Sequence, residues 1–303
     1  MPAKLWPFFG ENRHLLTLLF KLAAEPLLQT ASGKKITIGI FSALHTFGRD
    51  LKLNIHVHVS VTRGGLSQDS NEWKDIYFTK AKVMPMWRYS IIDLLRQEYK
   101  KGTLVIPEEY QHQIKSLAQL NRLLNPEYKK HWNVYFAKAK RDHKHNVDYL
   151  GRYIKRPPLA ESRLVHYDGP TVIFRYLDHY TKTQQKYECD TEHFIKLITQ
   201  HIPEKFFKMI RYFGFLSYRT RGKLLPKVYE LLGQVVKEPP TITYAELFAA
   251  NFYDNPALCL VCNSPMIPVY TQPETTLESL KPYHKALATR QIIEMPTAQM
   301  YVA

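Results

Sequence analysis

Two histidines, His56 and His58, stand one residue apart in the stretch LNIHVHVSV, where they alternate with β-branched residues. Successive side chains of a β-strand point to opposite faces, so both imidazoles share a face, roughly 7 Å apart along the strand. Two imidazoles placed in this way can bind one divalent metal ion. An ordinary half-exposed strand explains the same spacing, and both interpretations stay open. A third ligand has to come from another segment, and His45 on the preceding predicted strand is a candidate.

A second group of reactive residues, Tyr149 and Tyr153, lies four residues apart in DYLGRYIKR. On a helix such residues share a face, so both phenols would point the same way. A phenol can attack a phosphodiester and form a covalent intermediate that conserves the bond energy. Three nearby cations would bind a phosphate backbone: Arg152, Lys155 and Arg156. Packing in a core explains the spacing equally well, and another tyrosine pair in the chain shows it too.

The composition favours a polyanionic partner. The 303 residues include 42 Lys and Arg against 27 acidic residues, a formal charge of +15. Aromatic residues often stand beside basic ones, as in IRYFGFLSYRTRGK with Arg219 and Arg221, where cations neutralise phosphates and rings stack on unpaired bases. A generically basic protein with aromatic strand residues is the alternative.

Other compositional features restrict the location. No run of 18 apolar residues occurs, so neither a spanning helix nor a membrane partner is expected. The chain's start is a poor signal peptide, and three cysteines argue against a disulfide scaffold. We therefore expect a cytoplasmic protein of a reducing compartment that binds nucleic acid.

Apolar periodicity predicts the elements that must position these residues. Helices are expected over 12–31, 87–102, 107–128, 145–156, 191–202 (with Thr191 as a possible cap), 223–236 and 243–252. Strands are expected over 34–47, 53–61, 75–83, 131–139 and 206–217, with a hairpin over 162–178 turning at Asp168-Gly169. This mixture fits an α+β fold with a central, mainly antiparallel sheet flanked by helices and a mixed C-terminal extension.

Three long phrases resemble one known family: IGIFSALHTFGRDLKLNIHVHVSVTRGGLS, YLGRYIKRPPLAESRLVHYDGPTVIFRY and FKMIRYFGFLSYRTRGK. They are similar to the HUH rolling-circle transposases of bacterial insertion sequences, of the two-tyrosine type, from about residue 5 to 235. The resemblance implies an HUH endonuclease fold, Mg²⁺ or Mn²⁺ as cofactor, and single-stranded DNA at insertion-sequence ends as partner. His56 and His58 then match the metal ligands, Tyr149 and Tyr153 match the nucleophiles, and His45 lies in LHTFG, which also matches.

The resemblance implies an enzyme that cleaves and rejoins single-stranded DNA. The ion would polarise the scissile phosphate, and the attacking phenol would leave a 5′-phosphotyrosine and a free 3′-hydroxyl. Family members usually begin with a cysteine-rich, zinc-binding segment, whereas this chain starts at MPAKLWPFFG, so we expect a shortened copy. The alternatives are a truncated, catalytically inactive DNA-binding remnant and a related rolling-circle replication initiator or relaxase.

We expect three parts of the chain. A catalytic domain with the tyrosine helix would span 1–158, an α/β continuation 159–235, and a helical, loosely ordered tail 236–303. The tail holds Cys259 and Cys262 at the spacing of a zinc knuckle. A closed zinc site needs four ligands, and His284 is the other downstream candidate, so zinc binding and ordinary thiols both stay open.

Overall fold

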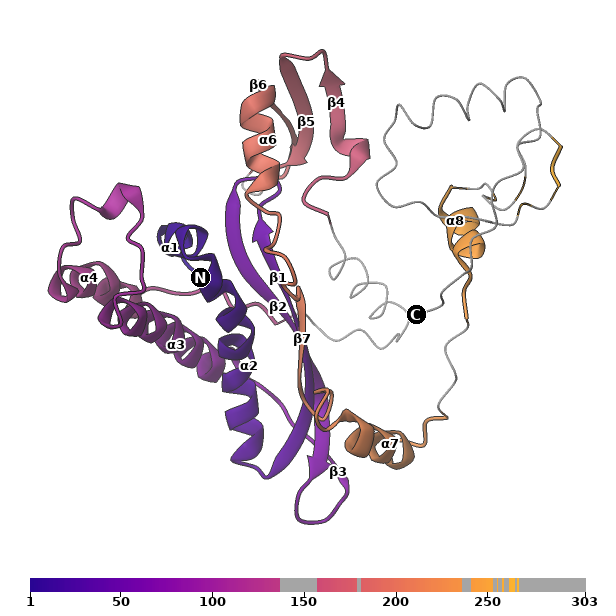
Figure 1. Ribbon diagram of the computed structural model, residues 1–303. Helices are drawn as coiled ribbons and strands as arrows, with labels where there is room; N and C mark the ends of the chain where they lie inside the picture. The colour runs from indigo at the N-terminus through magenta and orange to yellow at the C-terminus, as the bar shows by residue number, and fades with distance from the viewer. Residues whose placement is uncertain are drawn as a thin grey trace, which may run out of the picture. The chain divides into compact units, whose positions relative to one another are not determined.

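The computed structural model describes residues 1–136, 157–178, 181–235 and 241–252, with short pieces between 255 and 266. The chain divides into two units, Met1–Val236 and Lys237–Ala303. Among the described residues, every strand and every helix except α8 (Tyr244–Phe252) belongs to the first unit (Figure 1). The described helices include none long and apolar enough to cross a lipid bilayer.

A four-stranded antiparallel sheet carries the histidines, with strand order β3-β2-β1-β7 (Figure 1). Its strands are β1 (Ile36–Phe47), β2 (Leu53–Ser67), β3 (Trp73–Asp75) and β7 (Ile210–Gly214). β1 and β2 form a long hairpin in which Ile55 and Val57 face the hydrophobic core. The intervening histidines therefore face the other way, which confirms the alternation predicted for this segment.

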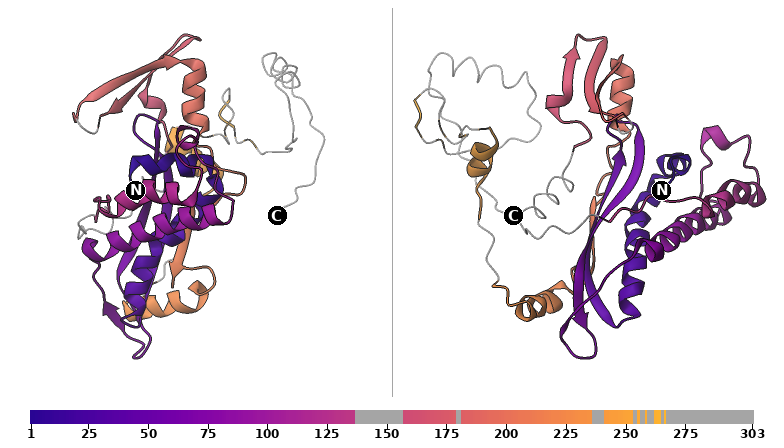
Figure 2. Two further views of the ribbon diagram at one scale, coloured as in Figure 1. Left: turned by 90° about the vertical axis from the view of Figure 1, so that its left-hand side faces the viewer. Right: turned by 180° about the vertical axis from the view of Figure 1, so that it is seen from behind.

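Helices cover one face of this sheet (Figure 2). They are α1 (Trp6–Glu11), α2 (Leu16–Ser32), α3 (Lys80–Lys100) and α4 (Leu117–Leu124). The apolar residues of α2 recur every three or four positions, which gives the helix one continuous apolar stripe. The stripe packs against the sheet, where Leu19 and Phe20 meet Leu44 and Ile55 in one core. The histidines thus project from a strand pair held from behind by a packed helical layer.

The return of β7 to the edge of β1 depends on a close backbone approach. Gly214 has φ +64°, and a Cβ there would lie 1.7 Å from the carbonyl oxygen of Ile38. Only glycine accepts both the left-handed conformation and this contact. The amide of Phe215 then donates to the Ile38 carbonyl at 3.0 Å. β7 therefore joins the sheet that carries the histidines, although it lies far downstream in the sequence.

A smaller antiparallel sheet, with order β4-β5-β6, packs against α6. These elements are β4 (Leu164–Tyr167), β5 (Thr171–Leu177), β6 (Gln184–Asp190) and α6 (Thr191–Thr199). Phe174 of β5 and Leu197 of α6 bury Leu51 from the turn between β1 and β2. Arg163 also donates to the backbone carbonyl of Arg49 in that turn. The second sheet thus holds the end of the hairpin that carries the histidines.

The remaining elements are short. Within the described ranges, five 3₁₀ turns lie at Ala3–Leu5, Arg13–Leu15, Glu108–Tyr110, Asn125–Tyr128 and Glu161–Arg163. Helix α7 (Arg221–Leu231) follows β7 and packs Val228 against Phe215. In the second unit, Thr243 and Glu246 form a reciprocal capping box at the start of α8.

The α+β architecture is the predicted one, but two predicted strands are wrong. Beyond Asp75, the last residue of β3, residues up to 83 do not form a strand. Helix α3 already begins at Lys80, and its helical apolar spacing buries Val83 and Trp87. Residues 131–136, the described part of the strand expected at 131–139, are not a strand either. Trp132 is buried there and donates its indole N–H to the carbonyl of Glu127, which fixes this segment as a loop.

The sequence also predicted some helix ends at the wrong residues. The helix expected over 107–128 is confined to α4, which starts where Ser116 accepts the amide of Gln119. The cap of α6 is Asp190, whose carboxylate accepts the amide of His193, so Thr191 is the first helical residue. Strand β6 was not predicted, because its largely polar sequence QQKYECD lacks a strand pattern.

Candidate metal centre beside the β1–β2 hairpin

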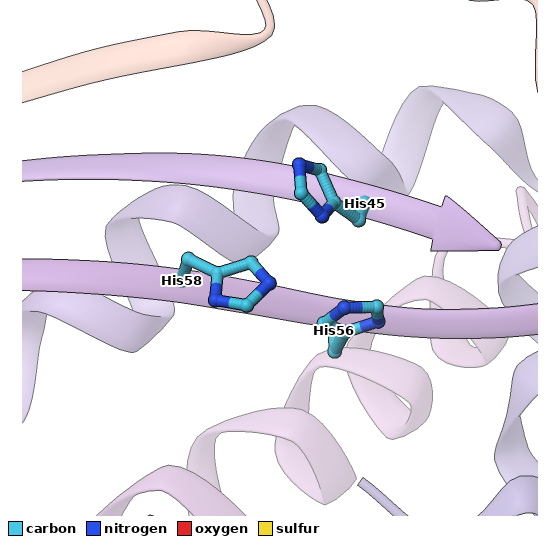
Figure 3. A group of neighbouring side chains, drawn as sticks. All are labelled: His45, His56 and His58. Carbon is cyan, nitrogen blue, oxygen red and sulfur yellow. The ribbon is translucent and has the colours of Figure 1, made fainter. Parts of the chain in front are cut away.

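The hairpin register brings three histidines together. His45 of β1 is the cross-strand partner of His56 in β2, and Ala43 is the partner of His58. All three imidazoles therefore project from the face opposite α2, here called the histidine face, and point toward one another (Figure 3). One ligand atom from each lies within 4.8 Å of the others. The candidate third ligand named from the sequence is thus beside the other two.

The hydrogen bond of His56 selects its tautomer. Its Nδ1 lies 2.7 Å from the carbonyl oxygen of Asn54. A carbonyl can only accept, so Nδ1 carries the proton and Nε2 keeps its lone pair. Metal-binding histidines commonly use their second nitrogen in this way. Burial lowers the pKa of His56 more strongly than the Asn54 hydrogen bond raises it, so the ring is neutral and able to bind a metal at neutral pH.

His45 is held by a chain of aromatic contacts. His45 is 4% exposed, and its ring stacks on Phe47 at a centroid distance of 5.1 Å. Phe47 in turn meets the ring of His201 at 5.7 Å. His201 donates Nε2–H to the carbonyl of Leu51 and accepts the Thr46 hydroxyl at Nδ1, at 2.7 and 3.0 Å. This buried clamp, absent from the sequence-based candidates, fixes the end of β1 next to His45.

The three imidazoles fit a divalent ion in both chemistry and spacing. Nitrogen ligands at about 2.1 Å from one ion stand roughly 3–4 Å apart, so small ring rotations would bring atoms now within 4.8 Å into range. Neutral imidazole suits transition ions better than Mg²⁺, which prefers oxygen ligands.

Most of the other site residues predicted from the sequence lie outside the part of the chain that the structure describes. The five that belong to the helix expected over 145–156 lie outside the described residues: Tyr149, Arg152, Tyr153, Lys155 and Arg156. Arg219 and Arg221 are exposed just before and at the start of α7. Cys262 is exposed, and Cys259 lies outside the described residues. Nucleophile, DNA-binding and zinc roles for these residues stay predictions.

Comparison with known proteins decides the family. A model described as "Putative transposase", of the Y2 type, matches residues 39–223, which include most of β1 and all of β2 and β7. The chain belongs to this transposase family. The matched segment contains all three histidines and both expected nucleophiles. The family predicted from the three long sequence phrases is therefore confirmed.

Two relatives with transposase names are also similar to this chain. The chain is 38% identical over 296 residues to the transposase for insertion sequence element IS801 of Pseudomonas savastanoi pv. phaseolicola, covering 97% of this chain and 72% of the relative. It is 31% identical over 251 residues to putative transposase y4qJ of Sinorhizobium fredii, covering 79% of this chain and 62% of the relative. No solved structure matches the chain significantly. The α+β architecture is consistent with an HUH endonuclease fold.

Proposed function

We propose that this transposase-family chain cleaves and rejoins single-stranded DNA by a metal-dependent reaction that forms a 5′-phosphotyrosine, as in rolling-circle transposition. The observation that supports this most is the convergence of His45, His56 and His58 on one face of the hairpin. The segment that matches the family, residues 39–223, contains this triad together with Tyr149 and Tyr153. A metal centre and phenol nucleophiles are the two parts that such a reaction needs.

The histidines would hold the ion, which when bound supplies Lewis-acid polarisation of the scissile phosphate. The neutral tautomer of His56 presents Nε2 as a ligand atom without loss of a proton. The helical layer packs against the other face of β1 and β2 and supports their backbone, so ion binding would need to order little more than the three rings. The triad's role would thus be to hold the ion, whose charge would orient one phosphate and stabilise the charge that develops on its oxygens.

Tyr149 or Tyr153 would act as the nucleophile. The phenolic oxygen bonds to phosphorus, the bond from phosphorus to the 3′ oxygen breaks, and the phenol's proton passes through solvent to give a 3′-hydroxyl. The strand stays attached through its 5′ phosphate, and attack by a 3′-hydroxyl reverses the step and rejoins DNA. The second tyrosine allows a second cut before the first strand is released. The DNA would be an insertion-sequence end, the element named for the relative from Pseudomonas.

The test is formation of a covalent adduct. The full chain is incubated with a labelled hairpin oligonucleotide and Mn²⁺, and denaturing gels show whether label stays on the protein. The variant with Tyr149→Phe and Tyr153→Phe should form no adduct but bind DNA normally, because only the hydroxyls are lost. The matched control is the variant with Tyr89→Phe and Tyr167→Phe, which alters two exposed tyrosines of the described structure. It should form as much covalent adduct as the wild type.

A chain that binds DNA without cutting it is the competing function, supported by the formal charge of +15. It predicts salt-dependent binding and no adduct from the wild-type chain. Equal adduct from the wild type and the Tyr149→Phe, Tyr153→Phe variant would reject the nucleophile assignment.

A further inference from the structure

The histidine face continues from the triad into three aromatic side chains, Phe41, Tyr212 and Tyr218. The ring centroids of Phe41 and Tyr212 are 6.4 Å apart, and those of Tyr212 and Tyr218 are 5.7 Å apart. Phe41 and Tyr212 are only partly buried, and Tyr218 is 76% exposed. We call these three residues the aromatic platform. Cross-strand packing in the sheet accounts for the pair of Phe41 and Tyr212. It does not account for Tyr218, whose ring is largely exposed.

The strand register places the platform next to the candidate metal centre. Phe41 pairs with Tyr212 on one side, and Ala43 pairs with His58 on the other. Two residues along a strand span roughly 7 Å. Phe41, Ala43 and His45 are every second residue of β1, so their side chains lie on the same face of the sheet. Phe41 is therefore two residues along the strand from Ala43, the residue that pairs with His58. A flexible chain bound at the triad can therefore reach it directly.

The charge around the platform is complementary to a phosphate backbone. Between Glu204 and Glu230 the sequence contains seven Lys or Arg residues and no Asp or Glu. Three of the basic residues, all exposed, directly follow Tyr218 around the start of α7: Arg219, Arg221 and Lys223. Strands β1 and β2 also carry no acidic residue. Rings flanked by cations, without acids, are the combination that binds single strands through stacking and phosphate contacts.

We propose that Phe41, Tyr212 and Tyr218 stack on unpaired bases of the single DNA strand whose neighbouring phosphate lies at the histidine triad. This rests on the proposed function, because the triad fixes where the strand begins. The occupant is single-stranded rather than duplex, since a base paired within a helix has its faces covered by adjacent bases. The platform holds the strand without selecting its sequence, because every base has a π-face.

Binding to two oligonucleotides of equal length tests the proposal. One is an oligodeoxyadenylate of about 16 nucleotides, within the site sizes of single-strand binders, and the other is the same deoxyribose-phosphate chain without bases. The full chain is used in EDTA, so that cleavage does not occur. Tyr218→Ala should weaken oligodeoxyadenylate binding about 5- to 150-fold and leave binding of the abasic chain unchanged. Phe41→Leu with Tyr212→Leu, which keeps apolar side chains in the sheet, should act in the same direction.

The control is Tyr89→Ala, which removes a comparably exposed tyrosine, 59% accessible, from α3 on the other side of the sheet. It should bind both oligonucleotides as the wild type does. Equal losses on both oligonucleotides for Tyr218→Ala would overturn the proposal, since a charge or folding effect does not depend on bases. Unchanged binding of oligodeoxyadenylate would overturn it as well.

Failure of the platform and failure of the proposed function give different results. If the wild type forms no covalent adduct but Tyr218→Ala loses base-dependent binding, the platform is supported and the cleavage function fails. If the wild type forms the adduct but Tyr218→Ala binds oligodeoxyadenylate fully, the cleavage function is supported and the platform is rejected.

Discussion

Replacing one histidine of the triad should abolish most of the stabilisation that Mn²⁺ gives to the fold. The perturbation is His58→Ala, chosen because His58 is only partly buried, so its loss disturbs packing less than loss of the buried His45. A ligand that binds the folded state and not the unfolded state raises the free energy of unfolding by about 2.7 kcal/mol when its concentration is about 100 times its Kd. For a unit the size of Met1–Val236, each kcal/mol raises Tm by about 2–4 °C, so Mn²⁺ should raise Tm by about 5–11 °C.

The triad sets the size of the loss. Loss of an outer hydrogen-bond partner can already weaken metal binding about 100-fold, and His58 is one of three direct candidates. After a 100-fold loss the same Mn²⁺ concentration equals the new Kd, and the stabilisation falls to about 0.4 kcal/mol. The Tm shift should then fall to about 1–2 °C.

Thermal unfolding with and without Mn²⁺ measures this difference. His112→Ala removes an exposed histidine outside the triad and should keep the full shift. An undiminished Mn²⁺ shift in His58→Ala would refute the reasoning, because the ion would then be bound elsewhere.

Three further predictions concern the scaffold of the site. Gly214→Ala should lower stability in urea unfolding by at least about 1–2 kcal/mol, because its Cβ would lie 1.7 Å from the Ile38 carbonyl; an unchanged midpoint would contradict the β1–β7 approach. Phe174→Ala removes a fully buried ring and should cost about 3–5 kcal/mol in the same assay, whereas a cost below about 1 kcal/mol would show that the ring is not core. Burial lowers the pKa of His201, so its contribution to stability is present above the unfolded value of about 6.5 and is lost as pH falls through the folded pKa. His201→Gln should flatten this part of the metal-free pH–stability curve, and a curve of unchanged shape would reject the clamp.

Local patterns were sufficient to predict the strand that carries the pair of histidines. The period-two alternation around His56 and His58 placed both on one face, and the structure confirms this in β2. The helical spacing of apolar residues likewise located α2 and most of α3. These features depend on neighbours within a few residues, so the sequence displays them directly.

Features that depend on register or distant contacts could not be predicted. His45 was a candidate, but its pairing with His56 depends on where the hairpin turns, and a shift of one residue would move it to the other face. His201 reaches Thr46 across 155 positions of sequence, and Tyr212 pairs with Phe41 only because β7 returns to β1. No local pattern reports such contacts.

Mapping the DNA-linked peptide tests the central claim most directly. The full chain is incubated with single-stranded hairpin DNA and Mn²⁺, digested with trypsin, and examined by mass spectrometry. Arg152 lies between Tyr149 and Tyr153, so cleavage after it separates the two tyrosines and identifies which one reacted. We predict DNA on one of these two peptides in the wild type and none in His58→Ala. DNA linked to another residue, or equal linkage in His58→Ala, would contradict a metal-dependent tyrosine reaction at the triad.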